Sequence, residues 1–541
     1  MNVSLPPVVR GPSLQRVVRR LEARPRLRAA LIAAPLLLVV SLFIFTAYRG
    51  VDFGYHWDEV DWQVKPVRDM VASGILMPRG SIYPAFAKWL ILLPTLPAAV
   101  TEIMAPQHTA RSVQAAMVAA IDSPDYLLTA RRAFIVVSAL AIVWVYLAAL
   151  AFRRKWWEAL IAASCLGLSW EYNYHSRWVA TDCLAVQFSA MTLFFLAMFF
   201  RYRRAGWLYA AAVAAGLGTG AKFPAVILLF PVVLASVMSR KSYDVSGQLR
   251  RVVALCLVAV LAYLVTTPAT IFDPFTFTEQ LQWISEHYKN GHWTHTTANG
   301  FHHWWLVLVY LSVEYFSPYL PLSLVMFLSI FAGAVFWWRA DRRASVLLIG
   351  FPIAFLCFFC FRYKAMLARN YLVTIPFLSV LSARTFGELF ERVQRRWIRG
   401  IAAVLLVAAA AANAIWMVSA AETIRHVDPN ADTRAAIAYI AKHPKLKFRI
   451  SEKVAKLAAE QHLAMPANIT TTATSAGAFV FFAKAEGPDP YLIHTNDPWL
   501  TMAIFGPREL NFNWYSGWWG HDRILVMTLA KAKESGVALA K

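Results

Sequence analysis

Long apolar runs separated by short clusters of basic residues dominate the pattern of the chain. The first run extends from residue 29 to about residue 47 and follows residues 1–28, which contain seven arginines and one acid. A membrane-spanning helix needs about 20 apolar residues. The run is long for the apolar part of a signal peptide, and no A-x-A site follows it, so we interpret it as a first membrane span.

Ten further apolar runs predict ten more spans, which gives eleven in all. They cover about residues 131–152, 156–173, 183–200, 206–221, 223–239, 251–268, 318–338, 344–361, 371–389 and 401–420. Two other apolar stretches are predicted to be helices that lie at the membrane surface. Residues 84–104 contain three prolines, and residues 303–316 are short and rich in aromatic residues.

The basic clusters predict the orientation of the spans. Clusters at residues 153–155, 201–204, 240–251, 342–343 and 395–399 all fall on the same side as the N-terminus. Basic loops are typical of the cytoplasmic side of a membrane. We therefore expect residues 1–28 to form a basic cytoplasmic N-terminus, and an odd number of spans then places the C-terminus outside.

This orientation divides the chain into parts. Residues 29–420 form a transmembrane domain whose large external loops are residues 49–130 and 269–317. Residues 421–541 alternate a helical stretch at 433–442 with strand-like runs at 448–451, 478–483, 491–495 and 523–530. This pattern predicts a small α/β domain outside the membrane. We expect a multi-pass protein of the plasma membrane, the inner membrane of a bacterium.

Composition excludes the soluble alternative. Hydrophobic residues make up 59% and charged residues 16% of the chain, against about 45–50% and about 25% in soluble domains. A net charge of +22 would suggest nucleic-acid binding in a soluble protein, but here the basic residues form the topology clusters. The five cysteines are odd in number and lie in or beside apolar segments, which argues against a disulfide framework.

Acids that follow the first span are candidates for catalysis. His56 and Trp57 precede Asp58 and Glu59, and Asp61 follows two residues later. Neighbouring carboxylates shift each other's pKa, so one of them can act as a general base while the other tunes it or binds a metal. The alternative is an ordinary solvated loop.

A short loop between the third and fourth spans contains His175, Arg177 and Asp182. Ionisable residues at membrane depth are costly and indicate a functional site, although interfacial anchoring is an alternative.

Cations also lie on the external side, against the topological pattern. Lys222 follows a glycine-rich stretch that is not a nucleotide-binding loop, because Ala221 precedes the lysine and no strand precedes the glycines. Lys222 either binds a lipid phosphate or snorkels to the interface. Arg369 lies near Arg362 and Lys364 in another external loop, where an anionic lipid headgroup would explain three cations.

Histidines are dense in the loop after the seventh span. His287, His292, His295, His302 and His303 follow Asp273. This density suits either a metal site or interfacial hydrogen bonding, and the residues leave the two alternatives open.

Acids and cations from five loops thus converge on the external face of the predicted membrane. This arrangement suits a reaction on a phosphate-linked lipid. A transporter would be expected to place its polar residues near the midplane, and a lipid or solute transporter or flippase is the alternative function.

At these residues the chain resembles the GT-C glycosyltransferases, in particular the protein O-mannosyltransferase-like branch, which uses polyprenyl-phosphate sugars. The resemblance covers about residues 45–390. It rests on His56–Glu59, Tyr83–Leu90, Gly216–Lys222, Pro268–Asp273 with Gly291 and His292, and Arg369–Leu372 with Pro376. The aminoarabinose-to-lipid A transferases are related, but Ile82 and Tyr83 replace their Glu-Lys pair, which puts that branch's acceptor and metal ligand in doubt.

The resemblance implies a GT-C-type membrane enzyme that moves a sugar from a polyprenyl-phosphate donor to an acceptor hydroxyl, with inversion, on the external face. Asp58 would take the acceptor proton, and Glu59 would position the acceptor, tune Asp58 or join a metal site. The other positions that the resemblance marks are His56, Asp273 and His292.

Arg177, Lys222 and Arg369 would compensate the charge of the departing lipid phosphate, with Arg369 the best candidate, and Asp182 would contact the sugar. We expect no essential cofactor, and a divalent metal, where one is used, would take Glu59 and His292. The expected partners are the lipid-linked sugar, membrane lipids and an unidentified acceptor, without nucleic acid.

Overall fold

The computed structural model describes residues 25–52, 57–75, 77–78, 82–239, 245–291, 296–313, 315–425, 429–470, 475–482, 502–505 and 524–534. The chain forms two compact units. The first is helical and ends at Val418, and the second begins at Ser419 and takes in two short earlier segments. The division falls close to the predicted domain boundary at residue 420.

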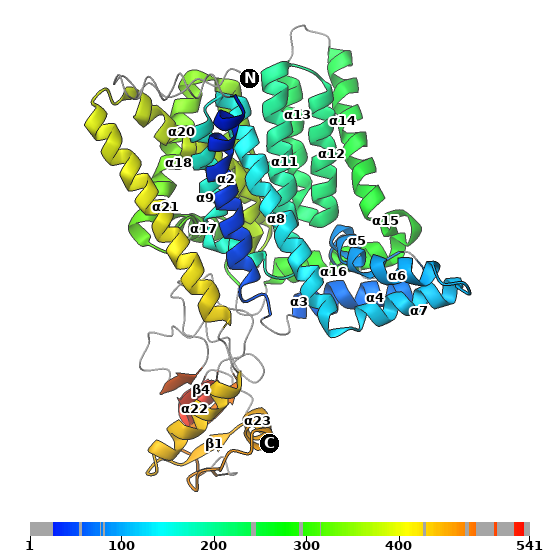
Figure 1. Cartoon of the computed structure of the whole chain (residues 1–541), viewed down its shortest axis with the longest axis vertical. Coiled ribbons are helices and arrows are strands. Elements are labelled where there is room, and N and C mark those ends of the chain that lie inside the picture. Colours follow the sequence, from blue (N-terminus) through cyan, green and yellow to red (C-terminus); the bar gives the residue numbers. More distant parts are fainter. Residues whose placement is uncertain are drawn as a thin grey trace. The chain divides into compact units, whose positions relative to one another are not determined.

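Each predicted span coincides with a helix or a pair of consecutive helices (Figure 1). They are α2 (Pro25–Tyr48), α8 (Pro124–Arg153), α9 (Trp156–Gly167) with α10 (Trp170–His175), α11 (Thr181–Tyr202), α12 (Gly206–Ala221), η3 (Phe223–Leu228) with α13 (Leu229–Met238), α14 (Val245–Thr266), α18 (Leu320–Ala340), α19 (Arg342–Arg362), η4 (Ala368–Thr374) with α20 (Ile375–Arg392), and α21 (Arg396–Arg425).

Eight helical stretches of the described residues are long and apolar enough to cross a membrane. One of them is Phe86–Ile103, which lies within a stretch that we predicted at the surface, whereas α2, α9, α12 and the η3–α13 pair are not among the eight. The helices confirm a multi-pass helical membrane protein, and the number of crossings stays a prediction.

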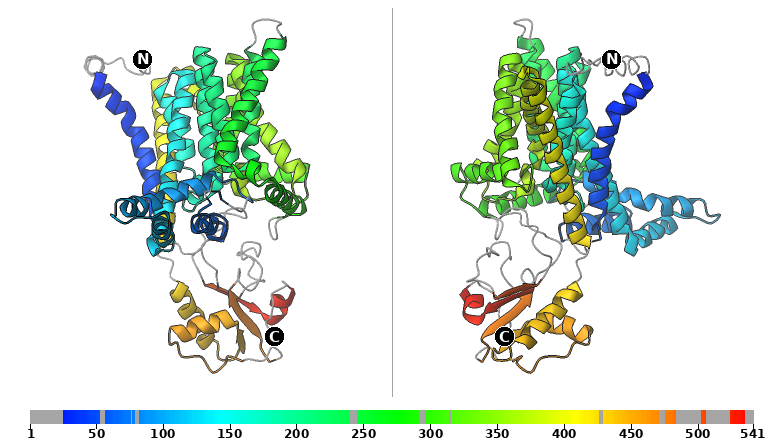
Figure 2. Two further views of the ribbon diagram at one scale, coloured as in Figure 1. Left: turned by 90° about the vertical axis from the view of Figure 1, so that its right-hand side faces the viewer. Right: turned by 60° about the vertical axis from the view of Figure 1, so that its left-hand side comes forward.

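Residues 65–121 form a layer of helices that do not follow the direction of the bundle. It contains α4 (Lys65–Ser73), α5 (Phe86–Leu92), η2 (Leu93–Thr95), α6 (Leu96–Ile103) and α7 (Ala110–Ile121). Figures 1 and 2 show α4, α6 and α7 lying crosswise to α8 at the end of the bundle where α8 begins, and projecting beyond it. Prolines break the run because proline lacks the N–H that a helix interior needs, and the orientation is the one expected of interfacial helices. The second predicted surface stretch forms α17 (Phe301–Val313).

Glycines of α12 allow close packing against α14. A Cβ added to Gly216 would lie 2.2 Å from the carbonyl oxygen of Ala259, and one added to Gly220 would lie 2.0 Å from Oγ1 of Thr266. Small residues are the usual means by which membrane helices approach each other. The glycine-rich stretch before Lys222 therefore serves packing, and it places the lysine at the end of a tightly held helix.

The second unit contains a four-stranded sheet in the order β1-β2-β4-β3. Its strands are β1 (Phe448–Ile450), β2 (Ala478–Phe482), β3 (Ala503–Phe505) and β4 (Ile524–Thr528). β1 and β2 are parallel, and the other two pairs are antiparallel. The helices of the unit are α22 (Pro429–Lys442), α23 (Glu452–Glu460) and α25 (Leu529–Glu534). This mixed sheet confirms the expected small α/β fold; the predicted strand at 491–495 lies outside the described residues.

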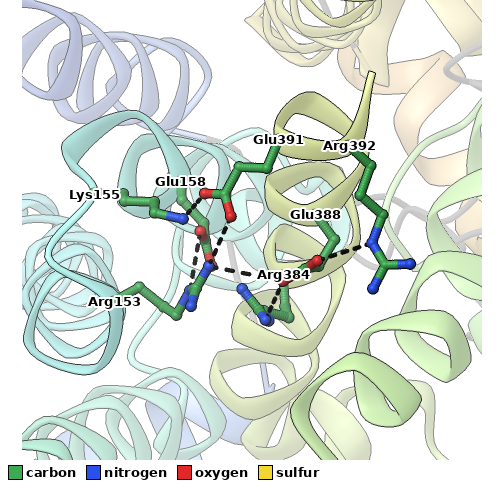
Figure 3. A network of polar contacts seen from close by, with 7 residues as sticks. All are labelled: Arg153, Lys155, Glu158, Arg384, Glu388, Glu391 and Arg392. Carbon is green, nitrogen blue, oxygen red and sulfur yellow. Dashed lines mark hydrogen bonds and ion pairs between the residues drawn. The ribbon is translucent and has the colours of Figure 1, made fainter. Parts of the chain in front are cut away.

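A network of seven charged side chains joins α8, α9 and α20 at one end of the helical unit (Figure 3), and we call it the end network. It consists of Arg153, Lys155, Glu158, Arg384, Glu388, Glu391 and Arg392. Gly387 makes room for it, because an added Cβ would lie 2.5 Å from Oε2 of Glu158. At 1.5 Å per residue, α8 begins about 44 Å from Arg153 and η4 begins about 30 Å from Glu388. The other ends of these helices therefore form a separate region.

Candidate active site

Asp58 and Arg369 form the centre of this second region. Asp58 lies in α3 (Trp57–Glu59), directly before the π-helical turn η1 (Val60–Val64). Its Oδ2 is 2.6 Å from Nη2 of Arg369, and the hydroxyl of Tyr83 donates a hydrogen bond to its Oδ1 at 3.2 Å. The structure thus brings the predicted base and the predicted phosphate ligand into direct contact, although 311 positions separate them in the chain.

Asp182 and Lys222 continue the cluster from Arg369. Nε of Arg369 lies 3.9 Å from Oδ2 of Asp182, and the ammonium of Lys222 forms an ion pair with Oδ1 of the same aspartate. Lys222 also donates to Oδ1 of Asn370 at 2.6 Å. We call Asp58, Arg369, Asp182 and Lys222 the charge ladder, because acids and cations alternate along it.

The ladder is shielded from solvent. Asp58, Asp182 and Lys222 are buried, and the side chain of Arg369 is only 14% exposed. Burial lowers the pKa of Lys222, although the charge of Asp182 acts in the opposite direction. The four residues come from four separate segments, the first loop, the start of α11, the end of α12 and η4. Only tertiary folding can hold such groups together, and opposite charge lets them be buried together.

Two tyrosines complete the surroundings of the ladder. Tyr83 is one, and burial together with the charge of Asp58 raises its pKa well above the usual range, so it remains a hydrogen-bond donor. The other is Tyr288, from α16 (Pro274–Asn290), which lies within electrostatic reach of Arg369, Asp182 and Asp58. Both phenols therefore present polar groups to the place where Asp58 meets Arg369.

A small cavity of about 10 Å³ lies beside the ladder. Asp182, Lys222 and Arg369 contribute its polar wall, and Phe355 and Phe359 lie on the apolar side. A cavity of that size holds about one water molecule. This cavity alone is too small for a sugar phosphate.

Three hydrogen bonds hold the backbone segment around Arg369. The hydroxyl of Tyr371 is 2.5 Å from Nε2 of His303, whose Nδ1 is 2.9 Å from the carbonyl oxygen of Tyr363. The hydroxyl of Tyr315 donates to the carbonyl of Tyr371 at 2.9 Å. His303, one of the histidines considered for metal binding, instead orients the turn beside Arg369.

The glycine of the predicted Gly291–His292 motif follows the last residue of α16. Its φ is +107°, and an added Cβ would lie 2.3 Å from the side chain of Thr296. Thr296 forms a β-bridge with Ala365, and the amide of Thr297 donates to the carbonyl of Lys364 at 2.9 Å. Gly291 is thus needed for backbone geometry next to η4.

Glu59 belongs to a different network from Asp58, its neighbour in sequence. Its carboxylate binds Arg131 through two nitrogens, with Nη2 at 2.6 Å and Nε at 3.0 Å from Oε2. The amide of Val179 donates to Oε1 at 3.0 Å. Burial raises the pKa of Glu59, while Arg131 acts in the opposite direction. Because both oxygens are engaged, Glu59 anchors α3 to α8.

The remaining predicted residues are placed as follows. Arg177 donates from Nη2 to the carbonyl of Thr46 at 3.0 Å and lies over the ring of Trp170, and the described residues show no contact between it and the charge ladder. Asp273 caps α16 by accepting a hydrogen bond from the amide of Thr276. His56 and His292 lie outside the described residues.

The sequence did not indicate all of these partners. Tyr83, Tyr288 and Asn370 were missed, although Tyr83 and Asn370 stood within segments quoted for the family resemblance. Arg131 was missed as well. Its signal was a basic residue at the external start of a predicted span, against the topological pattern.

A metal ion fits poorly at Glu59. Arg131 already occupies its carboxylate, and a dication beside that guanidinium would be repelled. Within the described ranges, no group of three His, Cys, Asp or Glu residues could hold a metal ion. The other predicted ligand, His292, is outside those ranges.

Residues 115–269 match the family model of dolichyl-phosphate-mannose-protein mannosyltransferases. The matched segment contains Arg131, Asp182 and Lys222 but neither Asp58 nor Arg369. It confirms the resemblance that the motifs indicate. No curated protein matches the chain.

Several solved structures are similar to the chain. ArnT from Cupriavidus metallidurans, bound to undecaprenyl phosphate, matches with 17% identity and a TM-score of 0.44 over 92% of this chain and 98% of ArnT. The Archaeoglobus fulgidus oligosaccharyltransferase, in complex with zinc and sulfate, matches with 12% identity and a TM-score of 0.45 over 85% of this chain and 68% of its own. The Saccharomyces cerevisiae protein O-mannosyltransferase Pmt1-Pmt2 complex, bound to the sugar donor, matches with 17% identity and a TM-score of 0.32. The match covers 46% of this chain and 35% of the yeast chain.

Proposed function

We propose that this chain is a membrane glycosyltransferase that transfers a sugar from a polyprenyl-phosphate donor to an acceptor hydroxyl, with inversion, on the external face of the membrane. The family match over residues 115–269 supports a transferase that uses lipid-phosphate sugars. The observation that carries the proposal is the contact between Asp58 and Arg369. It brings a carboxylate that can take a proton within 2.6 Å of a cation that can receive a phosphate.

In the proposed reaction the acceptor oxygen attacks the anomeric carbon from the side opposite the phosphate. Asp58 takes the hydroxyl proton, the new C–O bond forms, and the bond from the anomeric carbon to the phosphate oxygen breaks. The electron pair of that bond leaves with the polyprenyl phosphate. Arg369 and Lys222 stabilise the negative charge of the leaving group, and Asp182 contacts the sugar.

The closed ladder gives donor binding a further consequence. Arg369 holds Asp58 before the donor arrives, and the cavity beside it has room for about one water molecule. A donor phosphate that binds Arg369 competes with the Asp58 carboxylate for the same guanidinium. We therefore expect the donor to bind first and to release Asp58 as the base, with Tyr83 keeping its hydrogen bond to Oδ1.

Roles outside the ladder follow from the contacts already described. Glu59 positions Asp58 through its bond to Arg131, and Asp273 stabilises the start of α16. The donor role expected of Arg177 stays a prediction, since Arg177 binds the carbonyl of Thr46 instead of a ladder residue. The roles of His56 and His292 also stay predictions.

Product formation in detergent tests the proposal. Purified protein is incubated with polyprenyl-phosphate hexoses and pentoses and with an envelope extract of the producing cell, and release of polyprenyl phosphate is measured with wild type and Asp58→Asn. Release by the wild type alone is expected. Uptake or flipping that requires sealed vesicles, without transfer in detergent, would identify a transporter instead. Mass spectrometry of glycans and lipids from a deletion strain would then identify the acceptor.

Alkaline phosphatase fused after Lys541 tests the predicted topology. The fusion is expected to be active, because eleven spans and an internal N-terminus place the C-terminus outside. If the phosphatase fusion is inactive and a cytoplasmic reporter fused at the same position is fluorescent, the number of spans has been miscounted.

A further inference from the structure

Among the described residues, hydrogen bonds of Asn413, near the middle of α21, join this helix to the rest of the bundle. Its Nδ2 donates to the carbonyl of Phe316 at 3.0 Å, and the hydroxyl of Ser317 donates to its Oδ1 at 2.7 Å. The apolar window of the helix is only 6% buried. Figures 1 and 2 show α21 running obliquely past the other helices rather than parallel to them.

The oblique course leaves a cavity of about 610 Å³ between α21 and the helices α9, α18 and α20. Its wall on α21 extends from Arg399 to Asn413, about 21 Å at 1.5 Å per residue. Small side chains of α21, namely Ala402, Ala409 and Ala410, form part of this wall. The volume lies in the range of about 300–1,000 Å³ that is typical of ligand sites.

The occupant of such a cavity is a hydrocarbon chain. The wall is mostly apolar. Of its polar residues, Ser164, Arg399 and Asn413, the last already bonds to Ser317 and Phe316. Water needs two to four polar partners, which this wall does not offer. In a bilayer, the neighbouring acyl chains are the apolar molecules at hand, and a length of about 21 Å fits one extended chain.

Charge indicates which lipid supplies the chain. Arg399 forms part of the wall at one end of the cavity. Its Nε and Nη2 donate to the carbonyls of Val393 and Gln394, which fixes the guanidinium there. Arg395 and Arg396 lie one turn away or less. Basic residues at a membrane surface attract anionic headgroups, and the Asn413 end has no comparable charge among its described wall residues.

We propose that this cavity binds one acyl chain of an anionic glycerophospholipid, with the headgroup at Arg399. The site does not depend on the proposed function. It is distinct from the donor site, because α20 runs for about 25 Å between Ile375, just after η4, and Arg392, close to the Arg399 end. A polyprenyl tail anchored at Arg369 would enter from the opposite end.

Native mass spectrometry of the purified full chain tests the site. The protein is exchanged into detergent with phosphatidylglycerol or phosphatidylcholine, and retained lipid is counted. We expect one phosphatidylglycerol per chain. Ala402→Trp and Ala409→Trp, which fill the cavity, should abolish retention. Ala403→Trp and Ala411→Trp are matched controls, since both residues are exposed on the same helix outside the wall, and they should retain the lipid.

Headgroup preference provides the second measurement. Arg399→Gln should reduce the preference for phosphatidylglycerol over phosphatidylcholine by about fivefold, the effect of one basic residue near an anionic surface, and Arg399→Lys should restore it. Equal retention in all tryptophan variants would overturn the proposal. So would retention of polyprenyl phosphate in place of phospholipid, or a tryptophan effect that appears only as loss of a dimer.

Cross-linking keeps the test independent of mutant folding. Wild-type protein is illuminated in vesicles that contain phosphatidylglycerol with a photoreactive acyl chain, and the modified peptides are identified. Labels on α21 and α9 within the wall support the site. Labels spread evenly over the exposed faces of α14 and α18 would show that the cavity has no preference over the bulk bilayer.

Discussion

The charge ladder and the end network both pair acids with cations, at opposite ends of the η4–α20 pair, and they are built differently. In the end network Arg384 and Arg392 each pair with Glu388 one helical turn away, and Arg392 is 59% exposed. In the ladder no two of the four charged residues share a helix, and all are largely buried. Pairs along one helix form readily, whereas separate buried charges must overcome a desolvation cost that their attraction rarely exceeds.

This difference indicates what each region is for. The end network stabilises contacts between α8, α9 and α20 at a place where solvent can reach part of it. Four buried charges add little to stability even when they are paired, which supports the catalytic role proposed for the ladder. Variants of the two regions should therefore fail in different ways.

The largest expected effect is on turnover in Asp58→Asn. The amide keeps the shape of the side chain but cannot take a proton, and general-base catalysis is worth about 10²–10⁴-fold, so kcat should fall by that factor. Affinity for polyprenyl phosphate should not fall. It should rise if the Asp58 carboxylate competes with the donor phosphate for Arg369, as proposed. Turnover and lipid binding are measured on the same preparation, with Glu391→Gln of the end network as the control. Near-normal turnover, with Asp182→Asn inactive, would move the role of base to Asp182.

Glu59→Gln should damage stability rather than chemistry. The substitution leaves the guanidinium of Arg131 buried without its charged partner, and breaking a buried ion pair in this way costs about 3–5 kcal/mol. The melting temperature in detergent should fall below that of Asp58→Asn, because Arg369 keeps Asp182 as a second carboxylate and is 14% exposed, whereas Arg131 is only 1% exposed. Equal melting temperatures for the two variants would show that the ion pair of Glu59 with Arg131 contributes no more to stability than the ion pair of Asp58 with Arg369.

Arg369→Ala should weaken donor use. A hydrogen bond to a charged group contributes about 1.5–3 kcal/mol. Because about 1.4 kcal/mol corresponds to a tenfold change in affinity, the donor KM should increase by roughly 10–150-fold. Arg392→Ala removes an arginine from the same helical segment at its other end and serves as the matched control. An unchanged donor KM and kcat in Arg369→Ala would remove this residue from the site.

A small effect is expected from Lys155→Ala in the end network. Lys155 pairs with Glu391, and both side chains are partly exposed. Such pairs contribute about 0–1 kcal/mol, so activity should remain and the melting temperature should change by a few degrees at most. Loss of turnover in this variant would show that the two ends of the helices are coupled.

Metal removal should have the smallest effect. Arg131 engages Glu59 where a metal would bind, so activity should survive treatment of the purified enzyme with EDTA. Full loss that a single divalent ion restores would contradict this expectation, and Glu59 and His292 would then be the first ligands to replace.

Charge at predicted membrane depth was the most informative signal in the sequence. Asp58, Asp182, Lys222 and Arg369 stood out because ionisable groups there are costly, and the structure brings them into contact with one another. The pattern could not assign partners to Asp58 and Glu59. Successive residues of a helix point about 100° apart, so one acid faces Arg369 and the other faces Arg131.

Other features escaped the sequence for equally physical reasons. Tyr83 and Tyr288 contribute hydroxyls to the ladder, but tyrosines are common at membrane interfaces and gave no distinct signal. In the sequence, Arg177 resembled the other cations predicted on the external side, but the fold places its guanidinium against the carbonyl of Thr46. The long helices and the small sheet were predictable, because apolar runs and alternating strands are local patterns.

The anchoring of Glu59 has a consequence for how such an enzyme can change its specificity during evolution. Because Arg131 and the Val179 amide hold Glu59, the backbone one residue earlier has little freedom to follow a differently shaped acceptor. Even one added methylene in Asp58→Glu would displace the carboxylate by about 1.5 Å without a compensating shift of the chain. If Asp58 is the base, as proposed, new acceptors must be accommodated by the loops and surface helices that present them, while the proposed proton-accepting atom stays where it is.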